Sequence, residues 1–297
     1  MTLYTNKESN IRKTWLLFTI FLIVVIGLGW IFSRIYGNPG ILFFAVGFSI
    51  LMSFLSYWYS DKIVIGLSKA KPVTRENARE LYNVVENLCI TAGLPTPKIY
   101  LIEDSSPNAF ATGRNPQHAV VAVSSGLLGV LDRSELEGVL AHELSHIGNR
   151  DMLLSTMVVV LVGFVALLSD IFLRSMFWRG VGSGNRDRGG QAGAVLMLIG
   201  LILALLSPLI ATLIRLAISR KREFLADASG ALLTRYPEGL ARALEKIEKY
   251  SKPMKYANKA MAHLYIANPF STKNIAKLFM THPPIEERVK ALRDMSI

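Results

Sequence analysis

The sequence is poor in charged residues. Of its 297 residues, 19% are Asp, Glu, Lys or Arg, whereas soluble domains usually contain about 25%. The deficit is local, because four stretches contain no charge at all: 14–33, 35–60, 152–169 and 189–214. The rest of the chain has an ordinary polar composition. Fibrous, disordered and simple soluble proteins are therefore excluded.

Cysteine is almost absent as well. The single Cys89 cannot form a disulfide within the chain, which fits a reducing compartment. No small-residue cleavage site follows the first uncharged stretch, and that stretch is too long and too aromatic for a signal-peptide core. We therefore expect an uncleaved membrane anchor.

Each uncharged stretch meets the length needed to cross a hydrocarbon core about 30 Å thick, which is roughly 20 helical residues. The first two predict helices over 15–33 and 40–59, joined by a glycine- and proline-containing turn. Residues 1–60 are thus predicted to form a transmembrane hairpin. Basic residues flank this hairpin on both sides while its turn holds only Arg34, so the positive-inside rule places both of its ends in the cytoplasm.

Residues 152–214 predict a second hydrophobic hairpin with a glycine-rich linker. A spanning pair would place the four arginines of residues 173–192 outside the cell, against the positive-inside rule. A re-entrant or protein-buried pair therefore stays open as the alternative. Residues 61–151 and 215–297, on either side, are predicted to be two parts of one cytoplasmic domain.

The net charge of +11 comes mainly from residues 215–297, which contain 16 basic and 8 acidic residues. Anionic lipid on the cytoplasmic leaflet explains this excess at least as well as nucleic acid does, and no nucleic-acid-binding motif is present. We expect the partners to be the lipid bilayer and polypeptides, and not nucleic acid. Nothing in the sequence indicates an oligomeric state.

Residues 61–151 predict a small α/β unit. Helices are expected over 74–92 and from Asp132 onward, and strands over 98–103 and 118–124. Glu135 follows Asp132 at the spacing of a capping box, which marks the start of the second helix. Apolar residues then recur along that helix at helical spacing.

The second helix carries an HExxH motif, residues 142–146. His142 and His146 lie one turn apart and about 40° out of line, so both imidazoles can bind one metal ion. Glu143 lies about 100° round the helix, where a carboxylate can act as general base toward a metal-bound water. A helix with two surface histidines is the alternative, but the chain has only five histidines and the motif is rarely formed by chance.

A catalytic zinc needs a third protein ligand. Many carboxylates and three further histidines are available: His118, His263 and His282. Glu223 is the best candidate, because it closely follows the fourth uncharged stretch and His146 closely precedes the third, so that two helices side by side would bring the ligands together. Asp227, one turn further on, is placed to orient a ligand imidazole. Alternatively, Glu223 only balances the charges of Arg220 and Arg222.

Four segments together resemble the HtpX family of membrane metalloproteases, relatives of the CAAX prenyl proteases. They are residues 108–113, 142–146, 220–227 and 279–284, and the likeness covers almost the whole chain. The resemblance implies one zinc ion held by His142, His146 and Glu223. It also implies a protease of the bacterial plasma membrane that acts in protein quality control.

The resemblance further suggests roles for two other segments. It places Asn108, Ala109, Phe110 and Ala111 beside the cleft, where an edge strand can pair with an extended substrate; a plain strand end is the alternative. It brings His282 toward the active site as a transition-state hydrogen-bond donor. The alternative is that His282 is a surface or helix-capping histidine. Apart from the resemblance, Arg288 in the helix after His282 is a candidate partner for Asp227 or another carboxylate.

The predicted fold class is a predominantly α membrane protein with four hydrophobic, transmembrane helices and a cytoplasmic HExxH zinc-metalloprotease domain that contains a small β-sheet. The predicted function is a zinc-dependent endopeptidase that cleaves misfolded or damaged membrane proteins at the cytoplasmic face. A CAAX-type processing protease and a non-proteolytic, zinc-stabilised membrane scaffold are the alternatives.

Overall fold

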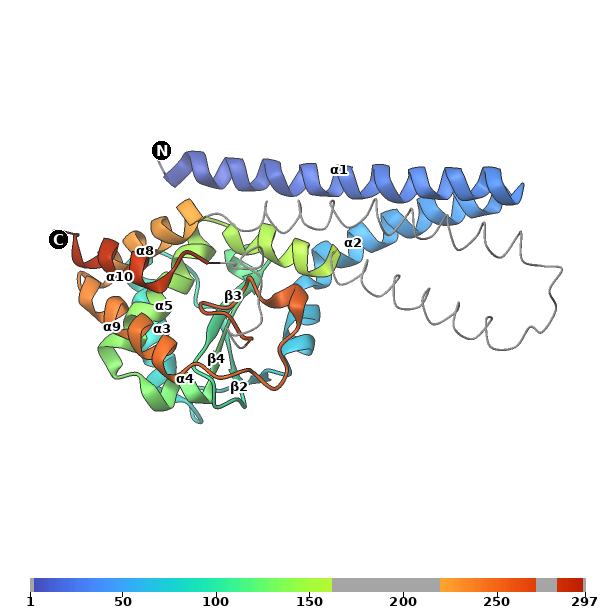
Figure 1. The fold of residues 1–297 in the computed structure, drawn as a ribbon. Helices are drawn as coiled ribbons and strands as arrows, with labels where there is room; N and C mark the ends of the chain where they lie inside the picture. The colour runs from blue at the N-terminus through green and yellow to red at the C-terminus, as the bar shows by residue number, and fades with distance from the viewer. Residues whose placement is uncertain (1–2, 162–219, 271–281, 296–297) are drawn as a thin grey trace.

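The computed structural model describes residues 3–161, 220–270 and 282–295. They form a long helical hairpin and a mixed α/β domain beside it (Figure 1). The hairpin consists of α1 (Leu3–Tyr36) and α2 (Gly40–Ser68), and its turn lies far from the domain (Figure 1). The fourth uncharged stretch, the linker at 173–192 and most of the third stretch lie outside the described residues, so the second hairpin stays a prediction.

Within the described residues, two helices are long and apolar enough to cross a membrane, Glu8–Ile31 of α1 and Gly40–Ser68. Large apolar side chains of both helices face outward, and Phe43 and Phe44 are 75% and 72% exposed. Contiguous apolar surface of this extent marks a lipid- or protein-covered face. α2 continues beyond the predicted end at residue 59 until Lys69 closes it in a left-handed conformation. One continuous helix therefore joins the anchor to the domain.

A four-stranded mixed sheet in the order β1-β2-β4-β3 forms the centre of the domain. Its strands are β1 (Lys71–Pro72), β2 (Lys98–Ile102), β3 (Ala109–Gly113) and β4 (Ala119–Ser124). β2 and β4 are parallel, and β1 and β3 pair antiparallel at the two edges. The sequence predicted β2 and β4 almost at their observed bounds. It missed β1, because two residues are too few to show alternation.

The helix predicted over 74–92 begins later than expected. α3 spans Arg79–Ala92 and ends at Gly93, which adopts the left-handed conformation typical of a helix C-cap. Before it, the Thr74 carbonyl accepts hydrogen bonds from the amides of Asn77 and Ala78. Ala78 has φ −141°, which is not helical. Thr74 therefore starts a separate turn and not α3.

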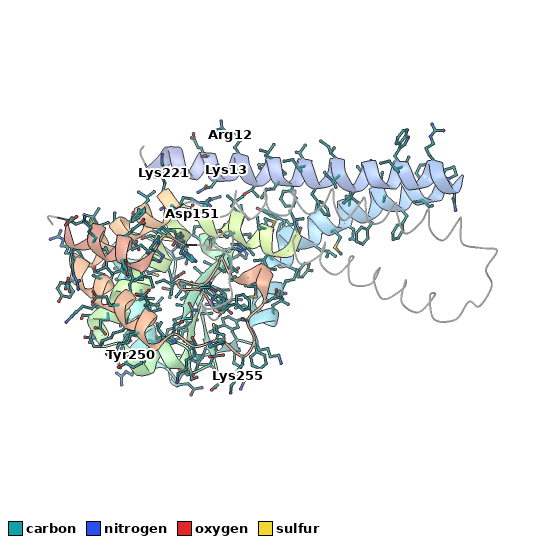
Figure 2. All side chains as sticks on the ribbon, in the orientation of Figure 1. Arg12, Lys13, Asp151, Lys221, Tyr250 and Lys255 are labelled. Carbon is teal, nitrogen blue, oxygen red and sulfur yellow. The ribbon has the colours of Figure 1, made fainter. Side chains whose placement is uncertain are left out.

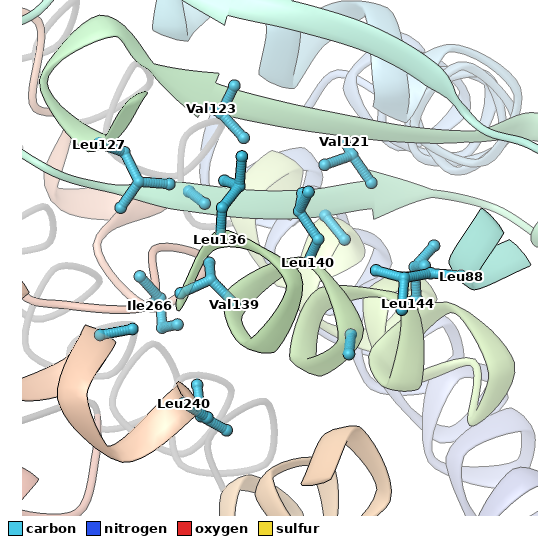
Figure 3. Close-up of a cluster of buried hydrophobic side chains, with 14 of the residues drawn as sticks. Leu88, Val121, Val123, Leu127, Leu136, Val139, Leu140, Leu144, Leu240 and Ile266 are labelled. Atoms are coloured by element: carbon cyan, nitrogen blue, oxygen red, sulfur yellow. The ribbon is translucent and has the colours of Figure 1, made fainter. Parts of the chain in front are cut away.

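Helix α5 (Arg133–Gly148) packs against the sheet and carries the HExxH motif. The predicted capping box is present, since Asp132 accepts a hydrogen bond from the Glu135 amide and Glu135 accepts one from the Asp132 amide. Leu140 and Leu144 of α5 lie in a buried apolar cluster with strand β4 (Figure 3). Because α5 is covered on several faces, His142 and Glu143 are buried along with its leucines.

Helices of the C-terminal part lie on the side of α5 away from the sheet. α8 (Arg220–Thr234) and α9 (Pro237–Tyr250) pack directly on α5, and α10 (Ile285–Arg293) packs on α9 and α8. Leu240 of α9 lies across α5 from the sheet (Figure 3). The helices pack closely, because a Cβ atom at Gly138 of α5 would lie 2.7 Å from the Leu240 backbone nitrogen. Shorter elements complete the description: α4 (Ser125–Val130), the helix Asp151–Leu161 after α5, and two 3-10 turns, Pro116–His118 and Lys259–Met261.

Candidate metal centre

The two histidines of the HExxH motif face one point beside α5. The Nε2 atoms of His142 and His146 lie 3.2 Å apart. The His142 side chain is 1% exposed and that of His146 is 16% exposed. The helical spacing therefore brings both imidazoles together, as the sequence predicted, in a largely buried place.

Helix α8 brings Glu223 to the same point. Its Oε2 atom lies 3.9 Å from Nε2 of His142, and its Oε1 atom lies 3.7 Å from Nε2 of His146. The approach of the two helices depends on Gly230 of α8, where a Cβ atom would lie 2.9 Å from the backbone nitrogen of His142. A glycine at this crossing thus permits the distance between Glu223 and the histidines.

These three side chains have the chemistry and spacing of a zinc site. In a tetrahedral zinc centre with bonds of about 2.0–2.1 Å, neighbouring ligand atoms are roughly 3.4 Å apart. The observed separations of 3.2, 3.7 and 3.9 Å bracket that value. Among the described residues, this is the group whose ligand atoms all lie within 4.8 Å of one another. Three protein ligands leave a fourth position open, as a catalytic zinc requires.

Behind His142 lies a buried ion pair. Oδ1 of Asp227 lies 2.9 Å from Nδ1 of His142, and Arg288 donates two hydrogen bonds of 2.7 and 2.8 Å to the Asp227 carboxylate. Burial opposes ionisation of Asp227, but the guanidinium of Arg288 outweighs it and lowers the Asp227 pKa to about 2. The sequence suggested that Asp227 faces one of the ligand imidazoles and that Arg288 pairs with a carboxylate. The structure shows that the imidazole is that of His142 and the carboxylate that of Asp227.

Behind His146 lies a carboxylate that the sequence did not single out. Oδ2 of Asp151 lies 3.2 Å from Nδ1 of His146, and Asp151 is 4% exposed. Burial lowers the His146 pKa, but the hydrogen bond to Asp151 and the charge of Glu223 outweigh burial and raise it to about 9. Asp151 follows the end of α5, where helical spacing no longer predicts which way a side chain points. No sequence signal could have identified it.

Glu143 is buried next to the two histidines and is 2% exposed. Burial raises its pKa to about 7, while the nearby His146 acts in the opposite direction. The backbone of Ala111 in strand β3 acts in the same direction as His146 and favours the charged form of the carboxylate. With a pKa of about 7, Glu143 can both accept and release a proton near neutral pH.

His282 contacts the third candidate ligand. Its Nδ1 atom lies 2.8 Å from Oε2 of Glu223. Burial opposes the charge on Glu223, but His282, His146 and Arg288 outweigh it and hold the Glu223 pKa well below its usual range. The Nε2 atom of His282 is buried without a hydrogen-bond partner among the described residues. His282 therefore lies at the site and keeps one ring nitrogen available.

Strand β3 borders the site with the edge that faces away from β4. The Ala109 carbonyl points away from β4, because it accepts a hydrogen bond from the amide of Ile266. Alternate residues of a strand share this orientation, so the backbone of Ala111 points outward too, next to Glu143. The Asn108 side chain is bonded to both backbone groups of Ala267, and Phe110 packs edge-on against Tyr265. Of the four residues suggested for substrate binding, Ala111 has its backbone at the site.

A cavity opens at the centre and is lined by residues from α5, α8, β3 and the segments after α5 and before α10. The ring of His263 belongs to its wall and lies 3.0 Å from the Ser155 carbonyl. His118 is exposed and bonded to Asn115. Neither histidine belongs to the group of candidate metal ligands.

A pair of histidines on one helix, a buried glutamate beside them and a carboxylate from a second helix together define the HExxH class of metallopeptidase sites. A model of "Peptidase family M48" matches residues 75–296 of the chain. The chain therefore belongs to peptidase family M48, a family of metalloproteases.

Curated relatives narrow the similarity further. A "Protease HtpX homolog" of Caldanaerobacter subterraneus subsp. tengcongensis is 46% identical over 298 residues, which are 100% of this chain and 99% of that protein. One of Thermococcus sibiricus is 46% identical over 95% of this chain and 96% of that protein. The resemblance to the HtpX family is thus confirmed.

A solved structure shares the fold. The crystal structure of S. mikatae Ste24p matches with a TM-score of 0.51 over 94% of this chain and 66% of that chain, at 22% sequence identity. At this identity the likeness concerns the arrangement of helices and strands alone. It covers the hairpin as well as the domain.

Proposed function

We propose that the protein is a membrane-integrated zinc endopeptidase. The observation that carries the proposal is the meeting of His142, His146 and Glu223 with the buried carboxyl of Glu143 in one cavity. His142, His146 and Glu223 would hold the metal. Zinc bound there would supply a Lewis acid that polarises a peptide carbonyl and makes a water acidic near neutral pH.

Glu143 would move the proton of the reaction. Its carboxylate takes a proton from the attacking water as the water oxygen bonds to the carbonyl carbon. It then gives that proton to the amide nitrogen as the C–N bond breaks, which releases an amine and a carboxyl product. Because Glu143 is buried, bulk water does not compete for the proton.

His282 and β3 would position the substrate. His282 contacts Glu223 through Nδ1. Its Nε2 atom has no hydrogen-bond partner among the described residues, and it would donate to the negative oxygen that forms on the substrate. The outward-facing backbone of Ala111 would pair with an extended peptide. This arrangement favours an unfolded substrate segment, because only an extended chain can add to a strand edge.

The hairpin supports a membrane location. Its two apolar helices have largely exposed side chains, and the basic residues at its ends favour a cytoplasmic domain in a plasma membrane of bacterial type. α1 also lies along the domain (Figure 1), which keeps the cavity near the bilayer. We infer that the substrates are cytoplasmic loops and ends of misfolded or damaged membrane proteins. The second spanning hairpin belongs to this proposal.

The test compares wild type with Glu143→Gln, both purified as full chains in detergent. We expect one zinc per chain in each. We expect the variant to cleave an unfolded membrane-protein substrate about 10²–10⁴ times more slowly, because general acid–base catalysis contributes that factor. Equal cleavage by both proteins would contradict the role of Glu143.

Two further outcomes point to the alternatives. Zinc binding without cleavage of any polypeptide would support a zinc-stabilised scaffold. Cleavage confined to prenylated C-terminal peptides would support a CAAX-type processing protease. Full zinc retention by Glu223→Ala would remove Glu223 from the ligand set.

A further inference from the structure

One face of α1 packs against the α/β domain. Along this face, buried residues recur at helical spacing: Asn10, Thr14, Leu17 and Phe21. Leu17 and Phe21 belong to the same apolar cluster as Leu154 of the helix Asp151–Leu161. Figure 2 shows Asp151 below the N-terminal part of α1, whereas Arg12 points away from the domain. The first turns of α1 thus lie on the helix that follows the HExxH motif.

Asn10 is the polar member of this face, and its side chain is fully engaged. Its Nδ2 donates to Oδ1 of Asp151 at 2.5 Å and to the Asn149 carbonyl at 3.3 Å. Its Oδ1 accepts a hydrogen bond of 3.2 Å from Nη1 of Arg222 in α8. Asn10 is 2% exposed. A buried amide costs free energy unless it is hydrogen-bonded, so apolar docking alone would not favour asparagine here.

The Asp151 carboxylate connects Asn10 to the metal site. The chain reverses after α5 through Arg150, which has φ 57°, and this turn brings Asp151 back toward His146. One oxygen, Oδ1, is held by Asn10 and lies 3.8 Å from Nε of Arg222. The other, Oδ2, faces Nδ1 of His146. The two oxygens of Asp151 therefore contact different groups, one the hairpin and the other the histidine.

We propose that Asn10 of the membrane hairpin is a positioning residue of the metal centre, acting through Asp151 on His146. The inference rests on the proposed zinc site. Asn10 fixes the carboxylate so that Asp151 accepts the Nδ1 proton of His146, which leaves the Nε2 lone pair directed at the metal. Partners of this kind set the tautomer and orientation of a ligand imidazole. Seating of α1 on the domain and metal affinity are thereby linked.

The test uses Asn10→Leu in the full chain in detergent. Leucine keeps the branched shape of the side chain and the apolar docking of α1, and it removes the hydrogen bonds to Asp151, Asn149 and Arg222. Zinc affinity is measured by competition with a fluorescent zinc chelator, and the geometry of the site by the visible absorption of bound Co²⁺. We expect an affinity loss of about tenfold, since loss of such partners costs about 10–100-fold, and a changed Co²⁺ spectrum.

Two comparisons separate positioning from a merely structural effect. Thr19→Ala removes an exposed side-chain hydrogen bond in the same helix, from Thr19 to the Trp15 carbonyl, and should leave affinity and spectrum unchanged. Asp151→Asn should lose about 10–100-fold in zinc affinity. The double variant Asn10→Leu/Asp151→Asn should be no worse than Asp151→Asn, because residues that act through one another are not additive.

The outcomes distinguish this inference from the proposed function. Failure of wild type to bind zinc would contradict the metal site itself. The inference is wrong if wild type binds zinc and cleaves substrate while Asn10→Leu shows the same zinc affinity and the same Co²⁺ spectrum as wild type. Additive losses in the double variant would show that Asn10 does not act through Asp151, and would overturn it as well.

Discussion

The two candidate histidine ligands are supported from opposite sides, and the supports differ in origin. Behind His142, Asp227 and Arg288 come from α8 and α10, both within the catalytic domain. Behind His146, Asp151 is held by Asn10, which comes from the hairpin of α1 and α2. We name these the inner side (Asp227 and Arg288) and the outer side (Asp151 and Asn10) of the centre.

The difference teaches how the two parts of the molecule depend on one another. The inner side is complete once the domain has folded. It contains a buried ion pair, and removal of either partner would leave an uncompensated buried charge. The outer side is complete only when α1 lies on the helix after α5. Changes on the inner side should therefore affect folding and metal together, whereas changes on the outer side should affect metal alone.

The largest effect is expected from Arg288→Met. Arg288 is 0% exposed, and its loss leaves the Asp227 charge buried without a partner, which costs about 3–5 kcal/mol of folding stability. Denaturant unfolding in detergent measures the loss. Arg293→Met is the matched control on the same helix, because Arg293 is exposed and bridges Glu238 and Glu245 at the surface. Equal losses in both variants would contradict the importance of the inner ion pair.

The next largest effect is expected from Gly230→Ala. The added Cβ atom meets the backbone of His142, and crowding of this kind costs about 1–3 kcal/mol. Because α8 must shift to relieve it, Glu223 should move and zinc affinity should fall along with stability. Gly129→Ala is the control, since a Cβ atom there meets nothing within 4 Å. Unchanged zinc affinity in Gly230→Ala would show that the helix crossing does not set the ligand distance.

Asp227→Asn tests the inner side without changing size. The amide cannot accept the Nδ1 proton of His142 and pair with Arg288 as the carboxylate does, so zinc affinity should fall about 10–100-fold. Competition with a zinc chelator measures it. Asp294→Asn, an exposed residue after α10, should match wild type. If Asp227→Asn also lowers folding stability while Asn10→Leu does not, the inner side contributes to both folding and metal binding and the outer side to metal binding alone.

The smallest effect concerns Cys89 of α3, which lies in the apolar core of the domain and reports on its opening. Burial raises the pKa of its thiol to about 11, and only the thiolate reacts with alkylating reagents. Alkylation of the folded chain should therefore be slow at pH 8 and faster as the pH rises toward 11. Arg288→Met should accelerate it by favouring opening of the domain, whereas Asn10→Leu should leave the rate near that of wild type. Mass spectrometry of alkylated protein gives both rates.

Local sequence rules predicted the elements that carry the chemistry. The capping box at Asp132 and the helical spacing of the histidines fixed the start of α5 and the face that the imidazoles share. The same rules failed at Thr74, because a capping residue also suits a single turn. They also missed β1, whose pairing with β2 depends on a partner distant in the sequence.

The parts of the site that depend on long-range packing were predicted in part or missed. Glu223 and Asp227 were identified because helical spacing and the neighbouring uncharged stretch suggested where they would lie. Gly230 was not, because the need for a glycine appears only where two helices cross. Asp151 and Asn10 were not, because they meet through a chain reversal and a docked helix.

The sequence alone determined the poverty in charge, the uncharged stretches and the helix that aligns His142 with His146. These follow from composition and from the 3.6-residue turn, which act over a few residues. Only the tertiary structure decided which carboxylate faces each imidazole and what holds it there, because packing joins Asp227 of α8 to His142 of α5 and Asn10 to Asp151, which is 141 residues away. Hydrogen bonds between such distant groups leave no periodic trace in the chain.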